Sequence, residues 1–209
     1  MRMKRMGVFE SFFEAVFGAK MNSGHAVSVI DIGGTYEFWK SMHFKYINNV
    51  SITLVNIVEI SKPSGEFDNI ISVKGDATNL TGFAEKEFDL VFSNSCIEHV
   101  GGRSEWEKMA SEIFRISDHF FVQTPNRYFP IEPHFLFPLF QFFPLKLRAL
   151  LIRCFQLGFW PQGKSWEESI QIAKEIELLS YKDLERLFPG AIIKSENFMG
   201  LTKSFMVYK

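Results

Sequence analysis

The sequence predicts an α/β fold built around a parallel sheet. From residue 27 onward, β-rich runs alternate with segments of helical periodicity, which is the pattern of parallel strands joined by crossover helices. The run FDLVFSN at 88–94 has an apolar centre, LVF, continuous enough for a strand buried on both faces. With 209 residues, the chain has the length of one ordinary domain and can bury a core without disulfides or metals.

Residues 1–24 are expected to form an amphipathic helix. Acidic residues interrupt its apolar positions, which argues against a signal peptide because the centre of a signal peptide is continuously apolar. The cytoplasm is therefore the expected location. The apolar positions, at helical spacing, are Val8, Phe9, Phe12, Phe13, Val16 and Phe17.

The remaining elements follow in order. Pro125 ends one strand, since proline has no N–H to give to a sheet. Strands are expected at 27–31, 52–57, 70–74, 88–94 and 119–125, with a closing pair at 191–200 and 204–209. Helices are expected around 38–44 and over 104–116, 165–179 and 181–188.

Composition excludes several classes of partner. The 23 basic and 24 acidic residues nearly cancel, and no basic stripe is present, so nucleic acid is not an expected partner. The two cysteines, Cys96 and Cys154, form neither a disulfide framework nor a cluster with zinc-ligand spacing. No metal site is predicted.

Residues 127–162 form a segment rich in Phe and Pro. It contains five prolines, and ten of the 24 Phe lie between positions 120 and 159. Its longest uncharged run, 135–145, is too short to cross a bilayer, which takes about 20 apolar residues. The segment is expected first to make a core or homodimer contact, next to act as a lid over a site, and last to contact a membrane surface through 135–153.

Residues at strand ends are the first candidates for a functional site, because ligands of open α/β sheets bind beyond the carboxyl ends of the strands. The first strand ends in VIDIGG (29–34), where glycines let a ligand approach the backbone. GDATNL (75–80) follows the third strand, and the fourth strand continues into FDLVFSNSCIEHV (88–100).

In this order and spacing, these motifs resemble a class I S-adenosylmethionine-dependent methyltransferase of the type-11 group. The resemblance covers about 27–124 and returns in the final helix and strand pair, leaving 1–24 and the Phe-rich segment outside it. It implies one methyltransferase domain over 1–209, with a Rossmann-like sheet of seven strands in the order 3-2-1-4-5-7-6 and helices on both faces. The seventh strand would be antiparallel. The implied cofactor is S-adenosyl-L-methionine, with S-adenosyl-L-homocysteine as product.

The resemblance also assigns the cofactor contacts. Asp31, Gly33 and Gly34 would line the methionine end, and Asn56 occupies the position of an acid that binds the ribose hydroxyls. The adenine would lie against Asp76 and Ala77, with Ser93 and Asn94 as the floor of the pocket.

Two departures from the family pattern stand out. Thr35 and Glu37 replace glycines of the loop, and Asn56 replaces an acid, for which Glu59 is a candidate substitute. Structural roles also stay open, because Asp31 can cap a turn and Asp76 can be an ordinary turn aspartate.

Methyl transfer requires alignment of the acceptor with the methyl group, and an oxygen or nitrogen acceptor also needs a base. His99 and His134 are the candidate bases. A structural role is an equal alternative for His99, and a role as a buried, hydrogen-bonded packing residue ranks ahead of catalysis for His134. Glu98 is expected only to favour a helix start. Arg127 and Tyr128 are the candidate substrate-binding residues, and Arg127 suits a carboxylate or phosphate.

The predicted function is methyl transfer to a small-molecule, glycan or lipid-linked acceptor. The alternative is a non-catalytic relative that serves as a binding or scaffold protein, which the irregular glycine loop and Asn56 favour. A nicotinamide dehydrogenase is a weaker option, because the GxGxxG fingerprint is absent.

Overall fold

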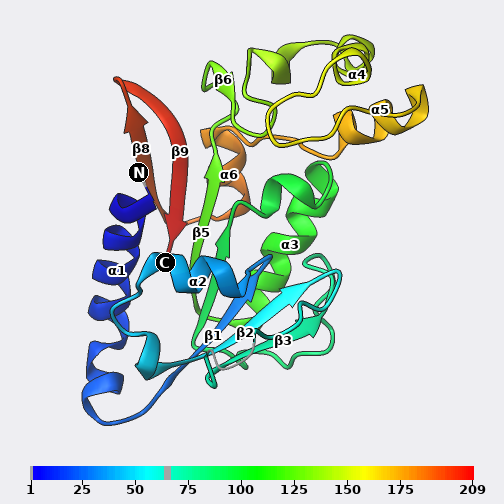
Figure 1. Ribbon diagram of the computed structural model, residues 1–209. Coiled ribbons are helices and arrows are strands. Elements are labelled where there is room, and N and C mark those ends of the chain that lie inside the picture. Colours follow the sequence, from blue (N-terminus) through cyan, green and yellow to red (C-terminus); the bar gives the residue numbers. More distant parts are fainter. Residues whose placement is uncertain (1, 64–66) are drawn as a thin grey trace.

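The computed structural model describes residues 2–63 and 67–209 and shows a twisted sheet with helices packed on both sides (Figure 1). The sheet contains β1 (Val27–Ile32), β2 (Val50–Asn56), β3 (Ile70–Lys74), β4 (Leu90–Asn94), β5 (His119–Pro125), β8 (Ile192–Phe198) and β9 (Leu201–Tyr208). Its strand order is β3-β2-β1-β4-β5-β9-β8.

This topology confirms the predicted fold. The pairs among β1 to β5 are parallel, whereas β9 is antiparallel to both of its neighbours. Within this sheet β8 is the sixth strand and β9 the seventh, so the order is 3-2-1-4-5-7-6 with an antiparallel seventh strand. The carboxyl ends of β1 to β4 therefore meet at one edge, where parallel sheets bind ligands.

An aromatic core lies on one face of the sheet, under α1 (Arg2–Asn22) and α2 (Tyr36–Met42). Phe9 is buried at its centre, with its ring 4.8 Å from that of Phe92 and 5.1 Å from that of Phe121. α1 lies within the range predicted for the first helix, of which Met1 is outside the described residues.

The opposite face is covered by α3 (Arg103–Ile116) and α6 (Tyr181–Leu187). Trp106, Met109 and Ile113 of α3 are buried against the sheet, as their helical spacing predicts. Ser180 and Asp183 form a reciprocal capping box that fixes the start of α6. Helices thus cover both faces of the sheet, and the carboxyl ends of its parallel strands are left for ligand binding.

The Phe-rich segment lies beyond the carboxyl end of β5 (Figure 1). It forms a hairpin, β6 (Ile131–Glu132) and β7 (Phe137–Pro138), then the short helix η3 (Phe140–Phe142) and α4 (Leu145–Cys154), which packs against α5 (Trp166–Lys174). Phe135 and Phe140 are buried in a core that these elements share. No helix within 2–63 and 67–209 has the length and apolarity that a membrane span requires.

One predicted helix is too long. α5 ends at Lys174 and not at residue 179. The Glu177 N–H instead donates to the Glu98 carbonyl at 2.9 Å, and Leu179 forms a parallel bridge with Asn126. These long-range backbone bonds replace the hydrogen bonds that a continued helix would make.

Candidate functional site

Two adjoining cavities open at the carboxyl ends of the parallel strands. The first has a volume of about 480 Å³ and the second about 300 Å³, and Gly33 borders both. Seven of the eight predicted cofactor residues line one or both cavities. The first is lined by Asp31, Gly33, Gly34 and Asn94, and the second by Gly33, Asn56, Asp76 and Ala77.

Asp31 carries an unsatisfied buried acceptor at the wall of the first cavity. Its side chain is 1% exposed, and Trp39 Nε1 donates to its Oδ2 at 2.8 Å. Its Oδ1 has no hydrogen-bond partner among the described residues. Burial raises the pKa of Asp31 to about 7, against the opposing effect of the Trp39 hydrogen bond. Such an oxygen is suited to a cationic or N–H-bearing ligand, because a buried acceptor without a partner is costly.

Gly33 and Gly34 each leave no room for a side chain, for different steric reasons. Gly33 has φ +78°, and a side chain there would meet Cys96 Sγ at 2.7 Å. A side chain on Gly34 would overlap the Asp31 carboxylate. Thr35, which departs from the family pattern, accepts a hydrogen bond from Phe38 N at 3.1 Å and caps α2.

The second cavity brings together residues from the ends of β2 and β3. Asn56 Nδ2 donates to the Gly34 carbonyl at 2.8 Å, so this side chain holds the glycine loop. Asp76 Oδ1 accepts from Thr78 N at 2.8 Å, which is the turn role that the sequence left open. Glu59 is exposed and is absent from the described lining of this cavity.

The two predicted floor residues differ in position. Ser93 is fully buried, and its hydroxyl donates to the Ile32 carbonyl at 3.1 Å, so it lies beneath the cavity wall. Asn94 reaches the first cavity, and its Oδ1 accepts from Arg5 Nη1 at 3.3 Å. Sequence reasoning did not assign Arg5, a basic residue near the start of α1, to the site.

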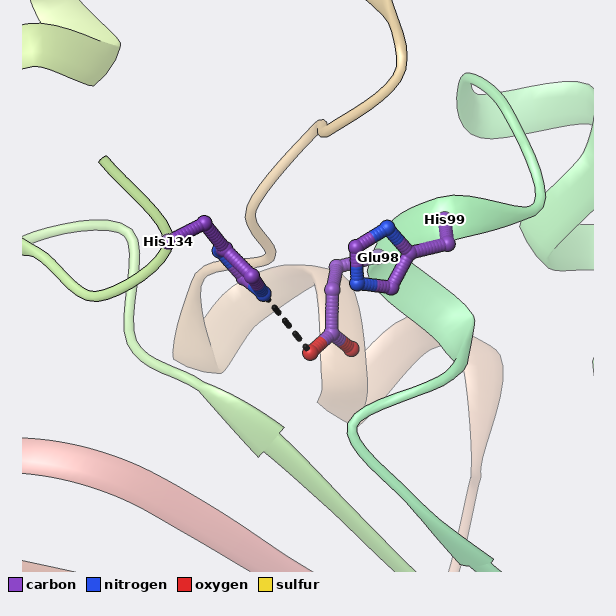
Figure 2. Close-up of side chains that lie close together, drawn as sticks. All are labelled: Glu98, His99 and His134. Carbon is purple, nitrogen blue, oxygen red and sulfur yellow. Dashed lines mark ion pairs between the residues drawn. The ribbon is translucent and has the colours of Figure 1, made fainter. Parts of the chain in front are cut away.

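His99 and His134, which are far apart in the sequence, meet beside Glu98 (Figure 2). Their ring centroids lie 4.9 Å apart. His99 and Glu98 belong to the short helix η2 (Ile97–His99), and His134 follows β6. Desolvation by the surrounding protein, together with the neighbouring His134, lowers the pKa of His99.

The Glu98 side chain is completely buried, and its two oxygens differ. Oε2 accepts from Thr124 Oγ1 at 2.9 Å, whereas Oε1 has no hydrogen-bond partner within the described chain. His134 Nε2 lies 3.9 Å from Oε1. Burial raises the pKa of Glu98 to about 7. Sequence reasoning gave Glu98 only a helix-start role, so this buried carboxylate is an addition to the site.

Glu132 positions His134. Its Oε1 lies 2.7 Å from His134 Nδ1, and its Oε2 accepts from His134 N at 2.8 Å and from Phe135 N at 2.6 Å. Glu132 is 2% exposed. A carboxylate on Nδ1 orients the ring and leaves Nε2 directed toward Glu98.

A third cavity, of about 240 Å³, contains Arg127 but not Tyr128. Arg148 and Lys174 also line it, and Glu177 links its wall to Glu98 through a backbone hydrogen bond. Tyr128 is 66% exposed and stacks on Phe142, with ring centroids 6.1 Å apart. Of the two predicted substrate residues, Arg127 therefore lines this cavity and Tyr128 does not.

Comparison with known proteins identifies a methyltransferase domain in part of the chain. Residues 34–118 match the family model of a methyltransferase domain, so the predicted resemblance is confirmed there. An uncharacterised protein of Mycobacterium tuberculosis is 37% identical over 57 residues, which cover 27% of this chain and only 20% of that protein. The match thus spans about a fifth of the relative's length.

Solved structures share the fold at low sequence identity. The 1,6-didemethyltoxoflavin-N1-methyltransferase of Burkholderia thailandensis, with S-adenosylhomocysteine bound, is 11% identical with a TM-score of 0.53, covering 97% of this chain and 76% of that one. The trans-methyltransferase CalH, in complex with S-adenosylhomocysteine, is also 11% identical, with a TM-score of 0.54, covering 88% and 51%.

Proposed function

We propose that this chain, which belongs to the methyltransferase-domain family through residues 34–118, is an active enzyme. It transfers a methyl group from S-adenosylmethionine to an acceptor that lies beside His134. The observation that carries the proposal is the buried Oδ1 of Asp31, which has no hydrogen-bond partner among the described residues and lies at the wall of the first cavity. S-adenosylhomocysteine in the two related structures is consistent with this cofactor.

The cleft offers suitable groups for each part of the cofactor. Asp31 Oδ1 would accept from the amino group of the methionine portion in the first cavity. In the second cavity, Asp76 would accept from the adenine amine, and Asn56 would bind a ribose hydroxyl while its Nδ2 holds Gly34. When bound, the cofactor supplies a methyl group made electrophilic by its sulfonium.

His134 is the proposed general base. With its Nδ1–H donated to Glu132, the Nε2 lone pair is available to take a proton from a hydroxyl or amine of the acceptor. The freed lone pair of the acceptor forms the bond to the methyl carbon as the sulfur–carbon bond breaks. His99 would border the acceptor on the solvent side, since its ring packs on that of His134 and is exposed.

The third cavity suggests an acceptor with a carboxylate or phosphate. Arg127, Arg148 and Lys174 contribute three positive charges to its lining, against the single negative charge of Glu177. Arg148 Nε is buried without a hydrogen-bond partner among the described residues. An anionic group on a small-molecule, glycan or lipid-linked acceptor would satisfy it.

Turnover tests the proposal. The purified protein is incubated with S-adenosylmethionine and a panel of acceptors that pair a hydroxyl or amine with a carboxylate or phosphate, and S-adenosylhomocysteine is quantified. We expect turnover that falls by about 10²–10⁴-fold in His134→Gln. The control is His25→Gln, since His25 is an exposed residue outside the cleft. Cofactor binding without turnover on any acceptor would favour the alternative of a non-catalytic scaffold, which Asn56 in place of an acid supports.

The remaining expectations about partners stay predictions. Several apolar side chains of 135–153 are exposed, which is compatible with a lipid surface or with a second copy of the chain. They are Leu136, Leu139, Phe142, Leu147 and Leu150. A cytoplasmic location and the absence of nucleic-acid binding are also kept as proposals.

A further inference from the structure

Three potential metal ligands converge next to the acceptor region. One ligand atom each from Glu98, His99 and His134 lies within 4.8 Å of the others. Two of these residues come from η2 and the third from the segment after β6, and Figure 2 shows all three side chains directed toward one another. The convergence thus depends on tertiary structure and not on a local sequence motif.

The buried carboxylate points to a missing ligand. Glu98 is completely buried, yet its Oε1 has no hydrogen-bond partner in the described part of the chain. His134 Nε2, at 3.9 Å, is too distant from this oxygen for a hydrogen bond. Donor atoms bound at about 2.0–2.1 Å around a tetrahedral zinc ion lie about 3.3 Å apart. The distance between His134 Nε2 and Glu98 Oε1 is therefore closer to the distance between two ligands of one metal ion than to the length of a hydrogen bond.

The surroundings of His134 also match those of a metal ligand. A histidine that binds metal through one nitrogen usually gives its other ring N–H to a carboxylate, which fixes the tautomer and orients the ring. Glu132 occupies this position at 2.7 Å from Nδ1 and is itself fixed by two backbone N–H groups. Glu132 is therefore a positioning residue that prepares Nε2 for coordination.

We propose that Glu98, His99 and His134 bind a divalent transition-metal ion, with Zn²⁺ the best match. Two imidazoles and one carboxylate form a ligand set typical of zinc sites that keep a coordination position open. His99 is exposed and gives the ion access from solvent, whereas Glu98 is buried at the base of the site. The sequence offered no zinc-ligand spacing because His99 and His134 are 35 positions apart in the chain.

Metal binding and methyl transfer are separable. In the metal-free protein, His134 Nε2 is available as a base. With the ion bound, the same nitrogen is a ligand, and the ion would lower the pKa of an acceptor hydroxyl at its open position. This second role rests on the proposed methyl transfer, whereas the binding of the ion does not.

The test uses full-length, tag-free protein treated with a chelator and then dialysed. Zn²⁺ is titrated by calorimetry, and Co²⁺ is added separately as a spectroscopic probe. We expect one ion per chain and a visible Co²⁺ spectrum of low-coordinate nitrogen and oxygen ligation. In Glu98→Gln and His134→Ala, the affinity should fall at least 100-fold, and in Glu132→Gln by about 10–100-fold. His25→Ala, which alters an exposed histidine outside the cluster, should bind as the wild type does.

Two results would overturn the proposal. One is the absence of saturable Zn²⁺ binding to the wild type, and the other is unchanged affinity in the double variant His99→Ala/His134→Ala. Circular dichroism confirms that each variant is folded. A titration with S-adenosylmethionine, performed on the same metal-free samples, shows separately whether the cofactor cleft works, so the two proposals fail independently.

Discussion

Replacing Asp31 by Asn tests both the electrostatics and the function of the cleft. The native carboxylate has one hydrogen bond, from Trp39, and one buried oxygen without a partner among the described residues. The Asn side chain keeps an oxygen for Trp39 and removes the ionisable group. The stability of the wild type should then depend on pH in a way that the variant does not share.

The sign follows from the raised pKa. An unfolded chain ionises Asp31 near pH 3.8, whereas burial raises its pKa in the folded protein to about 7. Between these values the native state binds more protons, so the free energy of unfolding falls as pH rises from about 4 to about 7. The full shift corresponds to about 4 kcal/mol, of which about 3 kcal/mol is lost between pH 5 and pH 8.

Urea denaturation at pH 5, 6.5 and 8 measures this effect. Asp31→Asn should be more stable than the wild type at pH 8, by up to about 4 kcal/mol, with the gain reduced at pH 5. Asp68→Asn is the control, because Asp68 lies on the surface. Affinity for S-adenosylmethionine, from calorimetry on the same samples, should fall about 10–100-fold, since a hydrogen bond to a charged group contributes about 1.5–3 kcal/mol.

The combination of outcomes decides the role of Asp31. Greater stability and weaker cofactor binding in Asp31→Asn are the expected result if Asp31 destabilises the wild type but is needed for function. If the variant is instead less stable at pH 8 and binds the cofactor as tightly as the wild type, Asp31 is a structural acceptor and the assignment of the first cavity is wrong.

Three further changes test the surrounding structure. Phe9→Ala should lower the free energy of unfolding by about 3–5 kcal/mol, because Phe9 is buried among aromatic rings. Urea denaturation measures this loss, and the exposed control Glu14→Ala should lose less than about 0.5 kcal/mol. A loss below about 1 kcal/mol in Phe9→Ala would contradict the packing. Gly34→Ala should weaken S-adenosylmethionine binding by about tenfold or more in calorimetry, since the new methyl group displaces the Asp31 carboxylate; unchanged affinity would refute this. Partial burial opposes ionisation of Asp89, but bonds from Lys20 and Ser28 outweigh it and lower the pKa below 3.8. Stability that this carboxylate provides is lost as pH falls through that lowered pKa, so Asp89→Asn should flatten the fall in unfolding free energy between pH 5 and pH 3, and an unaltered acid limb would disprove the contribution.

The central strands were predictable because burial on both faces leaves a largely apolar signal, and the predicted range 119–125 coincides with the buried strand β5. The predicted range 70–74 also coincides with β3, although only Ile70 of this edge strand is buried. The seven-strand order required the family resemblance, since periodicity does not reveal which strands are neighbours. Helical periodicity also predicted α5 to be longer than it is. The residues of its last predicted turn instead make backbone contacts with distant residues such as Asn126.

The candidate site was predictable where it depends on short motifs. Asp31 lies near the end of β1, Gly33 directly follows that strand and Asp76 follows β3, and their positions at one edge of the sheet follow from parallel pairing. Glu98 and Glu132 were not assigned to the site, because a carboxylate in the sequence carries no sign of whether it will be buried. Their roles emerge only when the segment after β5 folds back and brings His134 to Glu98.

The central claim is that the cleft at the ends of β1 to β4 binds S-adenosylmethionine, and calorimetric titration of the purified protein tests it most directly. The ligands are S-adenosylmethionine, S-adenosylhomocysteine, NAD and NADP, each titrated separately. We predict saturable binding of the two adenosyl thio-compounds at one site per chain and no binding of either nicotinamide nucleotide. Binding of NAD or NADP with no response to the adenosyl thio-compounds would contradict the account.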